Sequence, residues 1–396
     1  MHESVVQLRR PGVCVIASAS TWIEGEALRQ LDDVAGLPGM RACVGMPDLH
    51  PGKGTPIGAA FLSEGILYPT LIGSDIGCGM GLWSTDLSAR KVRPERLAER
   101  LEGLDEPWEG NVSAFLQEQL IVPTAFDGSL GTPGHGNHFV EIQTVARLSD
   151  PQRCTTLGLD ADHVLVLVHS GSRGLGESIL WRHAEAHGAG GLVVGFPEAD
   201  AYLASHDHAL RWAEANRRLC AERLLAAVGA DGIRLLDVCH NSVTSRITAN
   251  GPAWLHRKGA APADAGPVVI PGSRSDFSFL VEPDPSREDA LWSVAHGAGR
   301  KMARGEARAK LKQRYRRDDL CRNRFGGRVV CGDEQLLWEE APDCYKDVGS
   351  VIADLELAGL VRVIAVLSPI VTFKTSLGQP NRGLRPTTGD WLVSDN

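Results

Sequence analysis

An uninterrupted apolar run, Val164-Leu165-Val166-Leu167-Val168, ends directly at His169. A short run of this kind, without alternating polar residues, is typical of a strand that is buried on both faces. Residues 267–271 and 361–367 are further strand candidates because they are also short, apolar and rich in valine and isoleucine. The sequence therefore predicts at least one buried sheet.

Helical patterns alternate with these strands. Residues 201–227 and 346–357 carry apolar side chains at the spacing of an amphipathic helix. No internal repeat, low-complexity tract or long linker divides the chain. We therefore expect an α+β fold with one large, intimately mixed domain over residues 1–374, while the periodicity leaves two domains as the alternative. Residues 375–396 are rich in Gly, Pro, Thr and Asn and are expected to form an irregular C-terminal extension.

Composition limits the class of protein. Hydrophobic residues make up 43% of the 396 residues and charged residues 23%, as in ordinary globular proteins. No apolar stretch approaches the roughly 20 residues that span a bilayer. The N-terminal residues do not show the basic and then apolar pattern of a signal sequence. We expect a cytoplasmic protein.

Charge is unevenly distributed along the chain. The formal net charge is −8, which disfavours a protein that coats nucleic acid without specificity. Residues 300–328, however, contain twelve Lys or Arg against three Asp or Glu. Such a run is commonly a solvated helix face, but this one follows a glycine-rich loop, so a contact with a phosphate backbone is an equal alternative.

The nine cysteines are odd in number and show no disulfide spacing. Most of them are expected to be small buried hydrophobic residues. Cys78 differs because it lies three residues after Asp75 in a glycine-rich loop. A carboxylate and a thiol held this close resemble half of a metal site.

Three histidines could complete that site. His138, His169 and His240 each end or follow a strand-like segment beside small or amide residues. Carboxylate, thiolate and imidazole together suit a transition metal such as Mn²⁺, Zn²⁺ or Co²⁺ better than Mg²⁺ or Ca²⁺. Five ligands exceed the needs of one open catalytic ion, whereas a bridging thiolate would let them serve two.

His296 is the candidate nucleophile. Residues 291–295 before it are predicted to form a strand, and Gly297-Ala298-Gly299 after it could surround a phosphate with backbone N–H groups. The residues that follow are predicted to be helical, which would add the dipole of a helix N-terminus. An imidazole can attack the α-phosphorus of a nucleotide and form a phosphoramidate. The alternative is a histidine that only lines a phosphate pocket.

Several glycine-rich strings lie at predicted strand ends. They are residues 46–54, 134–139, 169–174, 239–241, 256–260, 271–274 and 296–300. In this order they resemble the RtcB RNA ligases, also called tRNA-splicing ligases, from about Met46 to Lys374. The resemblance implies an RtcB-type domain with mixed sheets around a central metal site. It also implies two Mn²⁺ ions, one held by Asp75, Cys78 and His138 and the other by Cys78, His169 and His240.

The same resemblance implies a guanylate site and an RNA contact. The matching histidine of the family, His296 here, is guanylylated by GTP. Residues that match guanylate contacts, or that flank His296, are Asn137, Phe139, Glu141, Asn241, Pro271, Gly272, Ser273, Arg274, Ser278, Gly297, Ala298, Gly299 and Lys374. Glu141 is expected to accept hydrogen bonds from guanine. Arg173 offers a bidentate fork for an RNA phosphate, with a structural salt bridge as its alternative role.

Some positions are assigned other roles or depart from the family pattern. Asp48 and His50 are expected to orient ligands or substrate, and His206 and His208, in the long helix, to be surface residues. Arg274 and Ser275 stand where family members commonly have Met and Gly, so the cation could add a phosphate contact or alter the nucleotide pocket. Lys374 lies near the usual end of the family chain, but further residues follow it here.

The resemblance implies an RNA ligase that depends on Mn²⁺ and GTP. Its substrates would be RNA ends with a 3′-phosphate or 2′,3′-cyclic phosphate and RNA ends with a 5′-hydroxyl, joined in tRNA splicing or RNA repair. The catalytic cycle would pass through a covalent His–GMP intermediate. Two other classes remain open: a metal-dependent RNA phosphatase or cyclic phosphodiesterase that does not ligate, and a non-enzymatic RNA-binding accessory protein.

Overall fold

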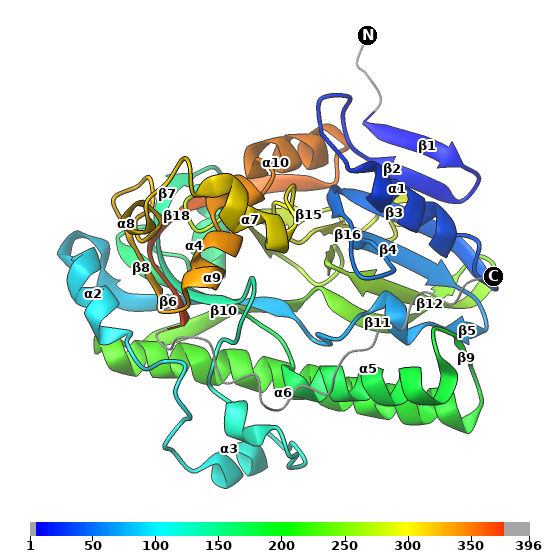
Figure 1. Cartoon of the computed structure of the whole chain (residues 1–396), viewed down its shortest axis with the longest axis horizontal. Helices are drawn as coiled ribbons and strands as arrows, with labels where there is room; N and C mark the ends of the chain where they lie inside the picture. Colours follow the sequence, from blue (N-terminus) through cyan, green and yellow to red (C-terminus); the bar gives the residue numbers. More distant parts are fainter. Residues whose placement is uncertain (1–4, 376–396) are drawn as a thin grey trace.

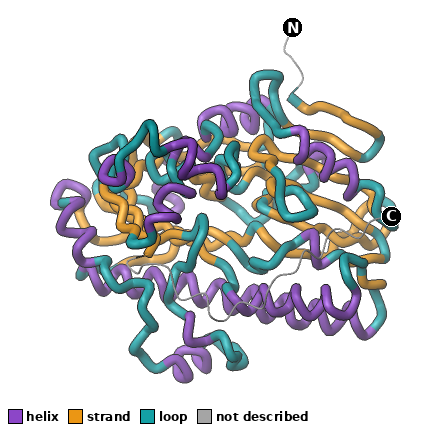
Figure 2. The backbone as a smooth tube through the Cα atoms, viewed as in Figure 1, coloured by secondary structure: helices purple, strands orange, loops and turns teal. Residues whose placement is uncertain are grey.

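The computed structural model describes residues 5–375 of the chain. Two mixed sheets form its centre (Figures 1 and 2). The first has six strands, in the spatial order β1 (Val6–Arg10), β2 (Val13–Ile16), β3 (Met40–His50), β4 (Ile57–Ser63), β12 (Gly251–Lys258) and β11 (Asn241–Thr248). Only β2 and β3 run parallel in this sheet.

The second sheet has eight strands. Their spatial order is β10 (Gly232–Cys239), β6 (Gly79–Ser88), β8 (His163–Ser170), β7 (Phe139–Leu148), β18 (Val361–Thr375), β15 (Ser278–Pro283) and β14 (Val268–Pro271), with β17 (Arg328–Cys331) pairing in parallel with β18. Two short pairs complete the β-structure: β13 (Ala260–Pro262) with β16 (Ser293–Ala295), and β5 (Ile66–Leu67) with β9 (Leu192–Val193). The prediction of an α+β domain with mixed sheets is confirmed.

Helices cover both sides of these sheets. The two longest, α5 (Gly174–His187) and α6 (Pro197–Val228), lie along the lower side in Figure 1. Helices α1 (Gly25–Val34), α7 (Arg304–Leu311) and α10 (Val348–Leu357) lie toward the upper side. The shorter helices are α2 (Pro94–Arg100), α3 (Val112–Glu118), α4 (Pro151–Leu157), α8 (Arg317–Leu320) and α9 (Glu334–Glu339). None of the helices in residues 5–375 has the length and apolar character needed to cross a bilayer.

The strand and helix that carry the strongest sequence patterns are present. Residues 164–168 are at most 1% exposed in β8, because neighbouring strands pair on both edges and α6 packs against one face. Helix α6 begins at Pro197, whose fixed φ suits a first helical position, and ends at Gly229 in the left-handed conformation. The predicted strand at 361–367 continues to Thr375.

Three local predictions are wrong. The strand before His296 contains only residues 293–295, because Leu291 and Trp292 have positive φ and turn the chain. The residues after Gly299 form a loop, and helix α7 begins only at Arg304, so no helix N-terminus lies at His296. His206 is fully buried rather than a surface residue, since its Nε2 accepts a hydrogen bond from the Val243 amide (3.1 Å).

The predicted C-terminal extension, residues 375–396, lies outside the described residues except for Thr375, which ends β18. All nine cysteines are free thiols. Five of the seven that were expected to be small core residues are buried, and Cys14 and Cys321 are half-buried. The prediction that the chain has no disulfide framework is confirmed for these residues.

Candidate active site

Strand pairing brings the five predicted metal ligands together at one end of the larger sheet. Asp75 and Cys78 lie in the loop that leads into β6, and His138 directly precedes β7. His169 is paired with Met80 of β6 on one side and with Phe139 of β7 on the other. His240 lies between β10 and β11, where its amide donates to the Cys78 carbonyl (2.8 Å). Five residues from distant parts of the sequence thus share one site.

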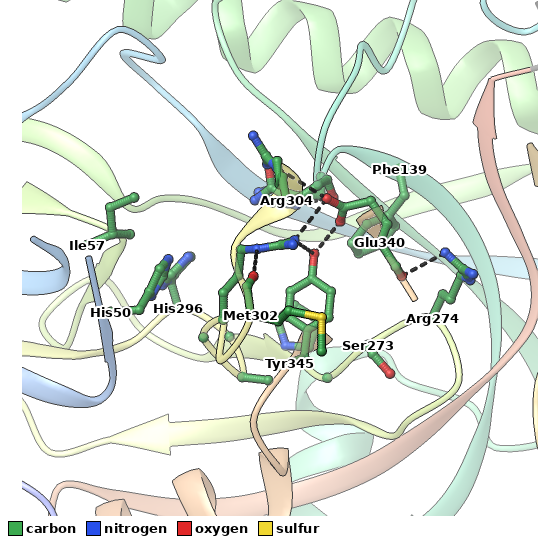
Figure 3. Close-up of a pocket in the computed structure, with 18 of the residues that line it drawn as sticks. His50, Ile57, Phe139, Ser273, Arg274, His296, Met302, Arg304, Glu340 and Tyr345 are labelled. Atoms are coloured by element: carbon green, nitrogen blue, oxygen red, sulfur yellow. Dashed lines mark hydrogen bonds and ion pairs between the residues drawn. The ribbon is translucent and has the colours of Figure 1, made fainter. Parts of the chain in front are cut away.

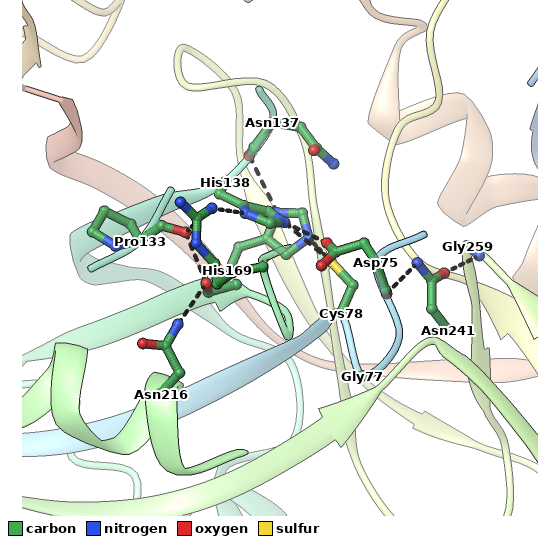
Figure 4. Close-up of polar contacts among 12 residues, drawn as sticks. Asp75, Gly77, Cys78, Pro133, Asn137, His138, His169, Asn216, Asn241 and Gly259 are labelled. Carbon is green, nitrogen blue, oxygen red and sulfur yellow. Dashed lines mark hydrogen bonds and ion pairs between the residues drawn. The ribbon is translucent and has the colours of Figure 1, made fainter. Parts of the chain in front are cut away.

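Two sets of three ligand atoms form within this cluster, and Figure 4 labels four of the five residues, Asp75, Cys78, His138 and His169. The ligand atoms of Asp75, Cys78 and His138 lie within 4.8 Å of one another, as do those of Cys78, His169 and His240. Cys78 belongs to both sets. Its Sγ lies 3.4 Å from Nε2 of His138 and 3.2 Å from Nε2 of His169. Each set could hold a metal ion, and Cys78 is the residue that the two sets share.

Burial sets the protonation of these groups. Burial, together with the charges of neighbouring histidines, holds the pKa of His169 and His240 well below the ordinary value, which leaves neutral imidazoles. Burial and the Asp75 carboxylate raise the pKa of the Cys78 thiol. Burial alone would raise the pKa of Asp75, but His138 beside it lowers that pKa to about 2. A bound cation would favour the Cys78 thiolate, the form that binds a metal.

Neighbouring groups fix the orientation of the ligands. Nδ1 of His169 contacts the Asn137 carbonyl (3.2 Å), so its Nε2 points toward Cys78. Asn241 donates to the Asp75 carbonyl (3.0 Å) and accepts from the Gly259 amide (2.7 Å). It thereby joins the loop that carries Asp75 and Cys78 to the end of β12. A Cβ atom at Gly171 would lie 2.2 Å from the Asp75 carboxylate, so only glycine fits there.

Arg173 adds a cation beside the cluster. It precedes α5 with φ 59°, and its Nη1 lies 3.3 Å from both the Pro133 carbonyl and Nδ1 of His138. Within the described residues its guanidinium makes no ion pair with a carboxylate, and its Nε is buried without a hydrogen-bond partner. This geometry does not support the structural salt bridge and leaves a donor for an anion.

A cavity of about 460 Å³ adjoins the cluster (Figure 3). It is lined by His296, by the metal-ligand candidate His169 and by most of the predicted guanylate residues, namely Asn137, Phe139, Glu141, Pro271, Gly272, Ser273, Arg274, Gly297, Ala298, Gly299 and Lys374. The volume lies within the range of small-molecule sites. The structure thus gathers residues from β7, β14, β18 and the 296–300 loop around one space.

Two predicted guanylate residues lie outside the lining. Asn241 instead donates to the Asp75 carbonyl in the loop that carries Asp75 and Cys78. Ser278 is buried and accepts a hydrogen bond from Gln143 (2.9 Å). Gln143 in turn donates to the Glu141 carboxylate. Ser278 therefore reaches the cavity only through Gln143 and Glu141 in this structure.

His296 lies between the cavity and the metal cluster. Its Nδ1 is 2.7 Å from Oδ2 of Asp48, a carboxylate with no exposed side-chain surface. Its ring centroid is 4.8 Å from that of His240. The two side chains are at ion-pair distance without a hydrogen bond between Nδ1 and the carboxylate, and Nε2 lies on the other side of the ring. His50 contacts the Asp48 carbonyl through Nδ1 (2.9 Å) and lines the cavity.

The chain holds Asp48 in place from two directions. Lys346 donates to the carbonyls of Pro47 (3.1 Å) and Leu49 (2.7 Å), which fixes the end of β3. Gly299, with φ 73°, passes so close that a Cβ atom there would lie 2.2 Å from the Asp48 carbonyl oxygen. The glycine-rich loop therefore packs directly on the strand that carries the orienting carboxylate.

A buried carboxylate that the sequence did not reveal organises the cationic wall of the cavity. Glu340 lies at the end of α9 and is 3% exposed. It pairs with Arg300 (3.1 Å), Arg304 (3.6 Å) and Lys374 (3.8 Å), and Tyr345 donates to it. Burial would raise its pKa, but these cations lower it to about 2. Its partners come from segments far apart in sequence, so no local motif marks it.

Arg274 extends this arrangement. It is buried, and its guanidinium donates to the Glu340 carbonyl (2.7 Å; Figure 3). It also donates to the Leu337 carbonyl (2.8 Å). These are orphan carbonyls at the C-terminal end of α9. Arg274 therefore ties α9 to the turn after β14. Of the two roles considered for this cation, the geometry supports a change in the pocket wall.

The fold and this site together define a protein with a candidate metal-binding site beside a cavity of small-molecule size. Comparison with known proteins identifies the family. The family model described as tRNA-splicing ligase RtcB matches residues 30–118 and 108–375. The chain belongs to the RtcB family.

Relatives from bacteria and archaea share most of the chain. It is 49% identical over 372 residues to RNA-splicing ligase RtcB2 of Escherichia coli, covering 93% of this chain and 97% of that protein. It is 31% identical to RNA-splicing ligase RtcB of Mycobacterium tuberculosis, over 86% of this chain and 99% of that protein. It is 29% identical to tRNA-splicing ligase RtcB of Archaeoglobus fulgidus, over 88% of this chain and 91% of that protein.

Proposed function

We propose that the protein is an RNA ligase that depends on Mn²⁺ and GTP and uses His296 as its nucleophile. The observation that carries the proposal is the position of His296, with its Nδ1 at 2.7 Å from buried Asp48 and its ring at 4.8 Å from that of His240. An imidazole held in this way offers Nε2 for attack on phosphorus. Family membership and the names of the relatives support the same activity.

The proposed cycle has three transfers. Nε2 of His296 attacks the α-phosphorus of GTP, forming a P–N bond as pyrophosphate leaves. The RNA 3′-phosphate then attacks the guanylate, which frees His296 and gives an activated RNA end. Finally the 5′-hydroxyl of the other RNA attacks the 3′-phosphorus, forms the phosphodiester and expels GMP. A 2′,3′-cyclic phosphate would first be hydrolysed to the 3′-phosphate.

Chain residues have separate roles in this cycle. Glu141 would accept from guanine, and Arg300, Arg304 and Lys374 would neutralise phosphate charge. Arg173 would receive an RNA phosphate beside the metal cluster. Asp75, Cys78, His138, His169 and His240 would hold two Mn²⁺ ions. When bound, the ions supply positive charge beside the reacting phosphates.

A ligation assay tests the proposal. One RNA carries a 3′-phosphate, the other carries a 5′-hydroxyl, and both are incubated with GTP and Mn²⁺. We expect a joined product that requires both cofactors. A phosphatase or cyclic phosphodiesterase would instead remove or open the terminal phosphate without GTP and would yield no longer RNA. An accessory RNA-binding protein would leave both RNA ends unchanged.

A further inference from the structure

The basic segment at residues 300–328 contains both paired and unpaired cations. Arg300 and Arg304, which line the cavity, pair with Glu340. Further along, Lys312, Arg316 and Arg317 are exposed, and none of the three makes an ion pair with a carboxylate of residues 5–375. We call Lys312, Arg316 and Arg317 the basic ridge.

Packing fixes the direction in which the ridge points. Ala307 and Leu311 of α7 and Leu320 of α8 are buried in one small core with Leu337 and Trp338 of α9. Because these apolar side chains face inward, the polar side chains between them are left on the surface. The helices that carry the ridge are thus anchored by this small core.

The ridge is continuous with the cavity. Arg304 lines the cavity and is also the first residue of α7, so the helix leads from the cavity wall to Lys312. Eight helical residues rise roughly 12 Å. The ridge therefore begins roughly 12 Å along the helix from the residue that lines the cavity.

Acidic neighbours do not cancel the charge of the ridge. Asp318 and Asp319 lie beside it in α8, and Asp319 accepts from the Arg316 backbone amide (2.8 Å). Arg314, between the ridge residues, pairs with Asp343 (3.2 Å). The three cations of the ridge therefore outnumber the two adjacent carboxylates, Asp318 and Asp319. The Asp319 carboxylate already accepts the backbone hydrogen bond from Arg316.

We propose that the basic ridge binds the sugar-phosphate backbone of the substrate RNA, several nucleotides from the end that enters the active site. This inference rests on the proposed function, because it takes RNA as the substrate. Exposed, flexible cations suit contacts with phosphates that carry no base information. The ridge would raise affinity for RNA of any sequence and would add to the salt dependence of binding.

A binding titration tests this inference. Fluorescence anisotropy follows a labelled single-stranded RNA with a 3′-phosphate, with Mn²⁺ but without GTP, over a series of salt concentrations. Wild type is compared with the triple variant K312Q/R316Q/R317Q. Each lost phosphate contact should reduce the slope of log affinity against log salt by about 0.7, so the slope should become shallower by about 2.

A matched variant controls for the change in net charge. R10Q/R182Q/R211Q also removes three exposed cations that make no ion pair within residues 5–375, but from β1, α5 and α6, away from α7 and α8 (Figure 1). Its salt slope should equal that of wild type. Melting temperature and Mn²⁺ content show whether each variant folds.

An unchanged affinity and slope in the ridge variant would overturn the inference. That is also the result expected if the ridge binds an acidic protein instead of RNA. An equal loss in both triple variants would overturn it too, since the effect would then be one of net charge. The titration contains no GTP, so its result does not depend on guanylylation. A failure of guanylylation would count against the proposed function but not against RNA binding by the ridge.

Discussion

Oδ2 of Asp48 lies 2.7 Å from Nδ1 of His296 and 3.3 Å from the His296 backbone amide. One buried carboxylate thus faces both the ring and the backbone of the candidate nucleophile. A carboxylate this close to Nδ1 favours the tautomer with its proton on Nδ1, which leaves Nε2 unprotonated, and it would stabilise positive charge on the ring after attack.

Asp48→Asn should therefore slow guanylylation with little effect on the fold, because the amide has nearly the same shape. We expect the rate of covalent labelling by GTP to fall roughly 10²-fold or more. Single-turnover labelling measures this, and GTP affinity serves as the control. A D48N protein that labels at the wild-type rate would show that Asp48 does not orient His296.

Cys78 and Asp75 should differ in their effect on metal content. Cys78 belongs to both sets of ligands, whereas Asp75 belongs to one. Cys78→Ala should empty both metal positions, and Asp75→Ala should chiefly weaken one. Elemental analysis after Mn²⁺ loading and desalting gives the number of ions per chain. Loss of a single ion in both variants would contradict a bridging thiolate.

Glu340→Gln should destabilise the protein, because it leaves Arg300, Arg304 and Lys374 without their shared buried carboxylate. Removal of one partner from a buried ion pair costs about 3–5 kcal/mol. Denaturant unfolding measures this free energy. Glu334→Gln is the matched control on the same helix, since its exposed pair with Arg308 should contribute no more than about 1 kcal/mol.

The loss in E340Q should also depend on pH. The pKa of Glu340 is lowered from 4.5 to about 2, so its ionised form stabilises the folded state fully above pH 4.5. That contribution falls as the pH drops from 4.5 toward 2. The stability difference between wild type and E340Q should shrink over this range. A difference that stays constant down to pH 2 would contradict the pairing.

Glu141 should make guanine selectivity depend on pH near neutrality. Burial raises its pKa to about 7, against the hydrogen bonds from Thr372 and Gln143 and the charge of Lys374, which lower it. Below pH 7 the carboxyl group gains a proton and loses acceptor capacity. Preference for GTP over ATP in covalent labelling should therefore fall roughly tenfold for each pH unit below 7. Glu141→Gln, which does not titrate, should remove this dependence.

Local patterns in the sequence predicted much of the fold and the metal site. The run at 164–168 predicted β8, and the period at 201–227 predicted most of α6. The five metal-ligand candidates lie beside recognisable glycine, amide or strand-end residues, and the structure brings them together. Local sequence patterns are enough to predict an element or a site residue when the neighbouring residues form a recognisable motif.

Long-range contacts explain what the sequence did not predict. His206 is buried because β11 packs against α6, where the Val243 amide donates to the His206 ring. The spacing of apolar residues along a helix cannot predict this contact. Glu340 becomes a pocket residue only when segments at 300–304 and 374 meet α9. The missing helix after Gly299 reflects the packing of that glycine on Asp48, which local helix propensity does not reveal.

Mass spectrometry of the protein after reaction with GTP and Mn²⁺ tests the central claim most directly. The account predicts a single GMP attached to the peptide that contains His296, formed with release of pyrophosphate and absent from H296A. The label should be lost when RNA with a 3′-phosphate is added. No covalent guanylate on the wild-type protein, or a guanylate that persists in H296A, would contradict the account.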